Sequence, residues 1–266
     1  MITVMVAGLP GRMATLVVGA IEKTKDLKIV SAALSEIDEN WLAGTGWITL
    51  VPLEEHEATL KQWVPDVVVD FTVPAAVNRN AELYCNCGIP FVMGTTGGDR
   101  DLLKKTVESS KICAVIAPNM APQIVVFQAM MEYAAKNFPD SFKGYCLRIT
   151  ESHQQGKKDT SGTAKAMVQY FNALGIPFTV DQIIMERNPR VQETSWGVPK
   201  NHLGGHAYHR YTLLSEDRTV LFEFRHNVNG RNIYIPGVLR AIRFLDEKVQ
   251  RGAQGIVFSM TDVLRE

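Results

Sequence analysis

The chain has 266 residues, of which 46% are hydrophobic, so it can form one large domain or two modest ones with a sizeable core. Its 28 basic and 28 acidic residues give a formal charge of zero, which argues against a general nucleic-acid or anionic-membrane surface. No apolar run approaches the roughly 20 residues that span a bilayer, and the opening MITVMVAG is too short and strand-like for a signal peptide.

The four cysteines match neither a zinc-binding spacing nor a small disulfide framework. They are Cys85, Cys87, Cys113 and Cys146. We therefore expect reduced, mostly buried thiols and no metal site. A reducing compartment follows, either the cytoplasm or, if a transit peptide has been removed, the plastid stroma.

In the first half of the chain, strands of the buried type alternate with helices. Apolar, β-branched runs predict strands at 2–8, 27–34, 66–72, 112–119 and the start of 90–98. Helical spacing predicts helices at 11–24, 54–63, 75–88 and 99–110, whereas 35–50 lacks periodicity and is expected to be loop. This alternation predicts an α/β fold with a Rossmann-like parallel sheet covered on both faces.

Beyond residue 121 the pattern changes. Helices are predicted at 123–137, 161–175 and 233–248, strands at 144–153, 206–215 and 219–228, and a closing strand at 255–264. The second and third of these strands are predicted to form a hairpin around EDR. We expect a discontinuous dinucleotide-binding domain formed by 1–121 and 236–266, and an α+β domain with a mostly antiparallel sheet over 122–235.

A glycine loop, VAGLPGRMA, separates the first strand from the first helix. Gly8 and Gly11 form a degenerate dinucleotide fingerprint, in which backbone N–H groups and the positive helix end attract a pyrophosphate. Pro10 removes one of those N–H groups, and the alternative is a tight turn without a ligand. The candidate pyrophosphate loop consists of Gly8, Leu9, Pro10, Gly11, Arg12 and Met13.

The end of the second strand bears on cofactor preference, because an acidic residue there binds the ribose of NADH and a basic one suits the 2′-phosphate of NADPH. The chain has Ser35 and Glu36 at this place. Ser35 could donate to a phosphate with Arg12 nearby, and Glu36 could hold the ribose or be merely solvated. Ser35 in place of an acidic residue favours NADPH, while NADH remains open.

Three further strand ends carry small polar side chains and accessible backbone groups suited to nicotinamide and ribose. Ligands of parallel sheets bind beyond the carboxyl ends of the strands. Any one of these turns alone would be ordinary, but together they predict a cofactor cleft. Its candidate residues are Phe71, Thr72, Gly94, Thr95, Thr96, Ala117, Pro118 and Asn119.

The stretch ESHQQGKKDTSGTA, residues 151–164, concentrates titratable groups between a strand and a helix. His153 and Lys157 could bind an acid and deliver a proton, with Asp159 orienting an amine. Ser161, Gly162 and Thr163 would offer a small carboxylate the positive end of the helix. The alternative is a solvated lysine-rich loop that begins with a helix cap.

A second basic set lies downstream. It consists of His206, His209, His226 and Arg231, within or just after the predicted antiparallel strands. Alternation with aromatic residues indicates that some of these side chains point inward. Histidines in strands are more often structural than ligating, and no carboxylate or cysteine cluster accompanies them.

Five motifs in register resemble the 4-hydroxy-tetrahydrodipicolinate reductase (dihydrodipicolinate reductase) family. They are GLPGRM, VVDFTVPAAV, PFVMGTTGG, APNM and ESHQQGKKDTSGTA, and the resemblance runs from residue 2 to 264. NAELY, GIPFVMGTTGGDR and the tail DVLRE are similar to the plant-type branch. The resemblance implies reduction of a cyclic dicarboxylate of lysine and diaminopimelate biosynthesis with NADPH or NADH.

The resemblance also implies roles by position. His153 matches the catalytic histidine and Lys157 the proton-donating lysine, with Gly162 and Thr163 binding a substrate carboxylate and Arg231 near the domain junction. Met120 joins the nicotinamide-side residues. Gln154 stands where many bacterial members have a second histidine, and it cannot titrate, so it becomes a substrate-binding candidate together with Ser161. The family implies a homo-oligomer, dimer or tetramer, assembled through the second domain.

Two alternatives stay open. One is a reductase of the same architecture that acts on another imine or carbonyl dicarboxylate. The other is a non-catalytic nucleotide sensor, which His153 and Lys157 argue against because a sensor needs no proton donor.

Overall fold

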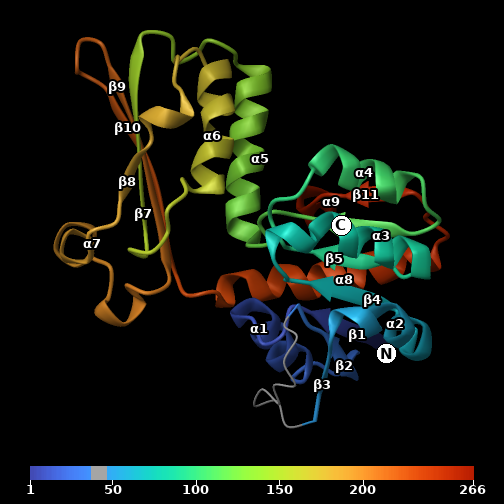
Figure 1. Cartoon of the computed structure of the whole chain (residues 1–266). Coiled ribbons are helices and arrows are strands. Elements are labelled where there is room, and N and C mark those ends of the chain that lie inside the picture. Colours follow the sequence, from blue (N-terminus) through green and yellow to red (C-terminus); the bar gives the residue numbers. More distant parts are fainter. Residues whose placement is uncertain (37–46) are drawn as a thin grey trace. The chain divides into compact units, whose positions relative to one another are not determined.

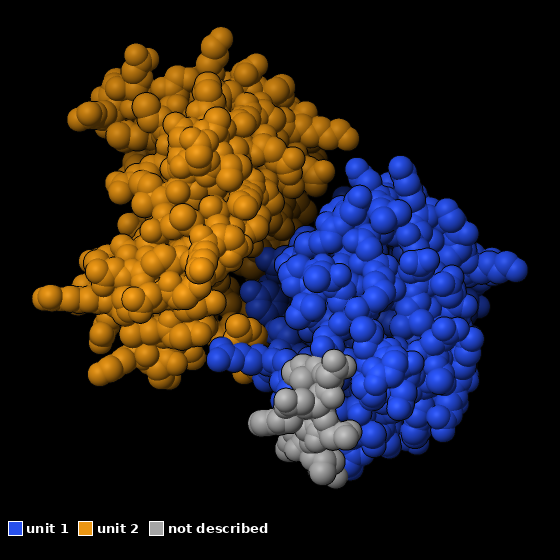
Figure 2. Space-filling model, viewed as in Figure 1, with its two compact units in different colours: residues 1–122, 234–266 blue, residues 123–233 orange. Residues whose placement is uncertain are grey.

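The computed structural model describes residues 1–36 and 47–266. These residues form two compact units, coloured separately in Figure 2: unit 1 comprises Met1–Pro122 and Tyr234–Glu266, and unit 2 comprises Gln123–Ile233. Unit 1 is thus built from two segments that are far apart in the sequence. Within the described ranges, no helix is long and apolar enough to cross a membrane.

Unit 1 is organised around a parallel sheet whose strands lie in the order β11-β6-β5-β4-β1-β2-β3 (Figure 1). The central strand β4 is buried throughout, and Val67, Val68 and Val69 have no exposed surface. A strand covered on both faces needs a continuous apolar sequence. The strands are β1 Ile2–Ala7, β2 Leu27–Leu34, β3 Thr49–Val51, β4 Val67–Asp70, β5 Phe91–Met93, β6 Cys113–Ile116 and β11 Ile256–Phe258.

Helices cover this sheet, and two of them come from the second segment of the unit. In the longer of these two, an added Cβ at Gly237 would lie 1.9 Å from the Met120 carbonyl oxygen. Only glycine permits this approach of helix and chain. The helices of unit 1 are α1 Arg12–Ile21, α2 His56–Trp63, α3 Val77–Cys87, α4 Arg100–Glu108, α8 Ile235–Gln250 and α9 Met260–Arg265.

Unit 2 combines a sheet in the order β10-β9-β7-β8 with helices α5 and α6, which lie side by side on one face of it (Figure 1). Met131 of α5, Ile149 of β7, Phe171 of α6 and Tyr211 of β9 share one buried cluster. The elements are α5 Pro122–Asn137, β7 Tyr145–His153, α6 Gly162–Ala173, β8 Ile184–Glu186, α7 Pro189–Trp196, β9 His206–Ser215 and β10 Leu221–Asn229.

The predicted fold class is confirmed, with a parallel sheet in unit 1 and a mostly antiparallel one in unit 2, where only β8 pairs with β7 in parallel. The hairpin of 206–215 and 219–228 is present as β9 and β10. The closing strand at 255–264 is wrong beyond Phe258. Ser259 and Asp262 form a reciprocal capping box that starts α9, and this cap ends the strand.

Two short elements and part of a third were not predicted. They are β8, α7 and β3, the last of which begins inside the stretch expected to be loop. The rest of that expectation, at 37–46, lies outside the described residues.

Candidate active site

The glycine loop of unit 1 forms a close turn between β1 and α1. Gly8 has a φ of +105°, and an added Cβ would lie 2.3 Å from the Phe71 carbonyl oxygen, while the Leu9–Pro10 peptide is cis. Gly11 is the N-cap residue of α1, and no side chain in the described part of the chain accepts a hydrogen bond from the first backbone N–H groups of this helix. A tight turn without side-chain bulk at Gly8, followed by such a helix N-terminus, suits the pyrophosphate of a dinucleotide.

A small pocket of about 220 Å³ collects residues from three turns of the same unit. Most of them were predicted from the sequence. The lining residues are Met13, Phe71, Thr72, Pro74, Gly94, Thr95 and Thr96. At Gly94 an added Cβ would lie 2.2 Å from the Phe71 ring, so a larger residue here would displace that ring.

A buried carboxylate that the sequence analysis did not single out organises these turns. Asp70 has no exposed surface. One of its oxygens accepts hydrogen bonds from the Thr72 and Thr95 hydroxyls, both at 2.7 Å, and the other accepts from Tyr84 at 2.8 Å and Asn80 at 3.0 Å. Asp70 therefore fixes the threonines of two predicted cofactor turns relative to each other.

The end of β2 differs from the sequence expectation in detail. Ser35 is buried, with 1% of its surface exposed. Glu36 accepts hydrogen bonds from Asn80 at 3.2 Å and from the guanidinium of Arg79, with which it forms an ion pair. Arg79, which was not predicted, thus places a cation beside this strand end.

The third predicted turn, after β6, stands apart from the 220 Å³ pocket. Ala117 and Met120 are buried, Pro118 is exposed, and Asn119 accepts a hydrogen bond from the Ala121 backbone at 2.9 Å. None of the four lines that pocket.

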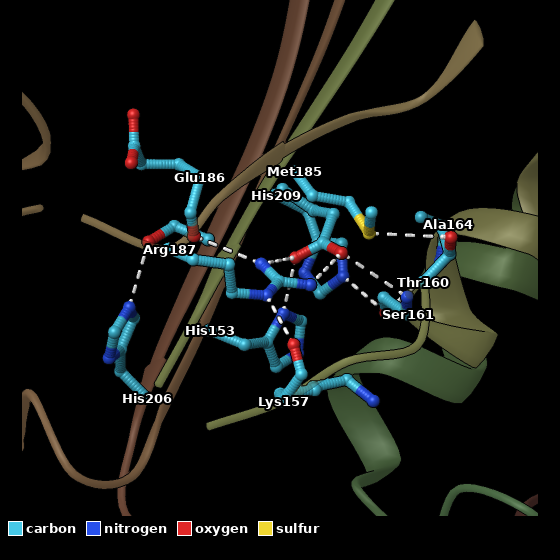
Figure 3. Close-up of polar contacts among 12 residues, drawn as sticks. His153, Lys157, Thr160, Ser161, Ala164, Met185, Glu186, Arg187, His206 and His209 are labelled. Carbon is cyan, nitrogen blue, oxygen red and sulfur yellow. Dashed lines mark hydrogen bonds and ion pairs between the residues drawn. The ribbon is translucent and has the colours of Figure 1, made fainter. Parts of the chain in front are cut away.

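In unit 2, His153 lies at the end of β7 and is held by a neighbour on the same strand. Its Nδ1 lies 2.6 Å from Oε2 of Glu151, a carboxylate with no exposed surface. Arg187 binds both oxygens of Glu151, at 2.6 and 2.8 Å. Figure 3 shows Arg187 together with His153 and Lys157. The Nε2 atom of His153 makes no hydrogen bond with a described residue, so this atom is available to a ligand.

The loop between β7 and α6 carries the predicted lysine. Lys157 Nζ contacts Asp159 Oδ1 at 2.7 Å, and its backbone N–H donates to the Gln154 carbonyl. The Lys157 side chain is 20% exposed, so its ammonium group is accessible although it is paired. The hydrogen bond with Lys157 lowers the pKa of the Asp159 carboxyl.

The residues predicted to bind a small anion lie at the start of α6. Ser161 is the N-cap and accepts from the Ala164 backbone, and its hydroxyl lies 2.7 Å from His209 Nε2. An added Cβ at Gly162 would meet nothing within 4 Å. Thr163 follows in the first turn of the helix.

The downstream histidines of β9 and β10 pack against one another and against β7. The His209 ring stacks on His226, with ring centroids 4.6 Å apart, and meets the His153 ring edge-on at 5.3 Å. His206 Nε2 lies 2.8 Å from the Ser152 hydroxyl. No group of metal-ligating side chains occurs among the residues that the structure describes.

Three titratable side chains in this part of unit 2 have pKa values shifted away from their ordinary values. Burial works to raise the pKa of Glu151, but hydrogen bonds from His153 and Arg187 outweigh it and lower that pKa to about 2. Burial, together with the charge of His153, lowers the pKa of His226 to about 4. Burial also lowers the pKa of His209 well below its ordinary range.

Arg231 lies at the same end of the sheet as His153. It follows β10, and its guanidinium approaches Gly205, where an added Cβ would be 3.7 Å from Nη1. The pairing of His153 with Ala207 and of Asn229 with His206 brings these strand ends together.

Two functional candidates escaped the sequence analysis here. Glu151 carried a signal, because residues i and i+2 of a strand face the same side, so a carboxylate two positions before His153 can reach its ring. Arg187 carried none, because only the pairing of β7 with β8 brings it to this place.

Comparison with known proteins identifies the family. The model for the N-terminus of dihydrodipicolinate reductase matches residues 2–120, and the model for its C-terminus matches residues 123–264. The chain belongs to the dihydrodipicolinate reductase family. The expectation of an NAD(P)H-dependent oxidoreductase is thereby confirmed.

Relatives within this reductase family include plant and archaeal proteins. A chloroplastic 4-hydroxy-tetrahydrodipicolinate reductase 2 of Arabidopsis thaliana is 44% identical over 100% of this chain and 78% of its own length. The reductase of Methanobrevibacter smithii is 31% identical over 99% of both chains. Among solved structures, a dipicolinate-bound dihydrodipicolinate reductase from Paenisporosarcina shares the fold, with a TM-score of 0.69, 22% identity and 97% coverage of both chains.

Proposed function

We propose that this reductase converts 4-hydroxy-tetrahydrodipicolinate, the dihydrodipicolinate-type cyclic intermediate, to tetrahydrodipicolinate in lysine and diaminopimelate biosynthesis. The observation that carries the proposal is that His153 ends β7, Lys157 lies in the loop that follows, and α6 begins directly after that loop, in unit 2 of a chain that matches both family models. This set can neutralise a carboxylate and move a proton at the same place.

Each residue of the set has a definite task in this proposal. The first turn of α6, at Gly162 and Thr163, holds one substrate carboxylate, assisted by Ser161, Gln154 and Arg231. Lys157 leaves Asp159 for the substrate and donates the proton from Nζ. His153, fixed through Nδ1, presents Nε2 to the ring of the substrate.

The dinucleotide fits unit 1. Gly8 to Met13 hold the pyrophosphate, and the pocket formed by Phe71, Thr72 and Gly94–Thr96 holds the nicotinamide side, joined by Ala117–Met120. When bound, NADPH or NADH would supply a hydride, which together with one proton reduces a single double bond of the ring once the 4-hydroxyl group has left as water. The chain's own part is to orient both ligands and to deliver the proton.

We expect NADPH to be preferred over NADH. Arg79 pairs with Glu36 yet keeps 47% of its side chain exposed, and an exposed guanidinium suits a 2′-phosphate. Replacing Arg79 with Gln should weaken NADPH binding about tenfold while changing NADH binding less than threefold, measured by fluorescence titration. Tighter binding of NADH than of NADPH by the wild-type protein would reject the preference.

The activity is tested by NADPH oxidation with freshly prepared product of the synthase reaction that forms the substrate. Turnover well above background is expected. If other imine or carbonyl dicarboxylates are reduced faster, the substrate is wrong although the reaction class stands. Cofactor binding without turnover of any of them would indicate a sensor instead.

We also propose a homo-oligomer assembled through the sheet of unit 2, in the plastid stroma or the cytoplasm. The edge strand β10 supports this, because Leu221 and Phe222 expose 63% and 43% of their surface. Light scattering should give a mass of two or four chains, and L221K should reduce it. A monomeric wild-type mass excludes this assembly.

A further inference from the structure

We propose that Glu151 and Arg187 are a positioning pair for the reaction: one buried ion pair fixes the His153 ring, the backbone at Lys157 and the start of α6 as a single unit. The proposal rests on the proposed function only where it concerns rate. Neither residue needs to touch the substrate.

Glu151 is the centre of this arrangement. Its Oε2 atom binds His153 Nδ1 at 2.6 Å and Arg187 Nη1 at 2.8 Å. Its Oε1 atom binds Arg187 Nη2 at 2.6 Å and the backbone N–H of Ser161 at 3.3 Å. The carboxylate therefore joins the His153 imidazole to Ser161, the residue that caps α6.

Arg187 uses all five of its N–H donors. Besides the fork on Glu151, Nε donates to the Lys157 carbonyl at 2.9 Å. Nη1 also donates to the Glu186 carbonyl at 2.9 Å, and Nη2 reaches the Asp159 carbonyl at 3.4 Å. Figure 3 shows the guanidinium between these segments. A lysine could not reproduce this planar set of contacts.

The pair joins parts of the chain that have no local reason to meet. Arg187 follows β8, whose Glu186 pairs with Ser152 of β7, so the strand register brings the guanidinium beside Glu151. The loop from 154 to 160 is thereby held at its middle by Arg187 and at its end by Glu151. Its geometry is set before any ligand arrives, which is what a proton-transfer site requires.

The two members of the pair reach His153 differently. Glu151 contacts the ring directly at Nδ1, whereas Arg187 acts on it only through Glu151. The other titratable or charged groups around the ring come from neighbouring elements and stay unchanged in the test. They are Lys157 and Asp159 of the loop and His206, His209 and His226 of β9 and β10.

The first test uses NMR of the protein labelled in its histidines, without substrate. The chemical shifts of the His153 ring, recorded at one fixed pH, should change in E151Q and in R187Q, because Nδ1 loses its carboxylate partner or that partner loses its guanidinium. R190Q, which changes an exposed arginine three residues away, is the matched control and should leave the His153 shifts unchanged. If the His153 ring signals are the same in all four proteins, the positioning of the ring by this pair is overturned.

The second test measures steady-state rates. E151Q and R187K should lower kcat at least about tenfold, because the imidazole and the loop lose their fixed geometry. The double variant E151Q/R187Q removes both charges, so it should fold even if a single variant does not. A double variant with wild-type kcat would refute the positioning role.

The two tests separate this proposal from the proposed function. If the wild type turns over no dicarboxylate but the NMR changes occur, the proposed reaction is rejected and the positioning role of Glu151 and Arg187 is supported. If the wild type is active but the variants show neither the NMR changes nor the rate losses, the positioning role is rejected and the proposed reaction is supported.

Discussion

The glycines of unit 1 differ sharply in the room around them. Gly8 combines a φ of +105° with a backbone oxygen 2.3 Å from the site of a Cβ, whereas Gly19 within α1 has nothing within 4 Å. The first is needed for the turn that approaches a pyrophosphate. The second is an ordinary helical glycine that reduces helix stability.

Gly8→Ala and Gly19→Ala should therefore act in opposite directions. Gly8→Ala should lower the stability by about 2 kcal/mol or more and weaken NADPH binding at least tenfold. Gly19→Ala should raise stability by about 0.5–1 kcal/mol and leave binding unchanged. Urea unfolding and fluorescence titration give both quantities, and equal effects of the two changes would contradict this account of the loop.

The neighbouring lysines of unit 2 offer a similarly direct comparison. Lys157 pairs with Asp159 and faces the proposed substrate site, while Lys158 is exposed. Lys157→Ala should lower kcat/KM several hundred-fold or more, since it removes a carboxylate contact and a proton source. Lys158→Ala should stay within threefold of the wild type. Activity of Lys157→Ala within threefold would remove this lysine from the mechanism.

At the scale of elements, the sheet of unit 2 holds two stacked histidines that remain neutral when folded. Burial lowers the pKa of His226 to about 4 from its ordinary 6.5, and burial lowers the pKa of His209 well below its ordinary range. The unfolded chain takes up these protons first as the pH falls. Their contribution to stability is therefore complete above pH 6.5 and is lost towards pH 4.

We expect the free energy of unfolding to fall by about 1–3 kcal/mol for His226 alone between pH 7 and pH 4.5. Urea unfolding across this range measures the fall. Glu151 adds little to this fall, because the stabilisation that comes with its depressed pKa is present above its ordinary 4.5 and is lost mainly below it. His226→Phe should flatten the pH dependence. A stability that does not change between pH 7 and pH 4.5 would show that these histidines are charged in the folded chain.

The elements that could be predicted are those whose burial leaves a pattern in the sequence. Strand β4 is apolar at Val67–Val69 because both of its faces are covered. Strand β8 has no such pattern, since Ile184 and Met185 are largely exposed. Helix α7 buries only Gln192, so no apolar stripe marks it, although Asn188 and Pro189 carry an N-terminal signal.

The candidate site divides in the same way. His153, Lys157 and Ser161 lie within one stretch, so local sequence brings them together. Glu151 follows from strand periodicity. The place of Arg187 beside Glu151 results from the pairing of β7 with β8. The contacts of Asp70 result from the packing of two turns that are distant in the sequence. Neither contact can be predicted from the residues next to Arg187 or Asp70 in the sequence.

For the whole molecule, the assignment of one ligand to each unit has a thermodynamic consequence. A ligand stabilises the unit that binds it, by about 2.7 kcal/mol at 100 times its Kd. NADPH should therefore protect backbone amides of unit 1, and dipicolinate, as a dicarboxylate probe, those of unit 2. Hydrogen exchange followed by mass spectrometry resolves the two. Protection of β7 and α6 by NADPH alone, with none from dipicolinate, would overturn the assignment.

Strand β11 covers the edge of β6, and its residues come after all of unit 2 in the chain. During synthesis, unit 2 can finish folding while β6 is still an unpaired edge strand of the unit 1 sheet. The sequence of β6, CAVI, is apolar, so its free edge could pair with another nascent chain. Because unit 1 is discontinuous, this edge becomes protected from such pairing only when β11 has been made.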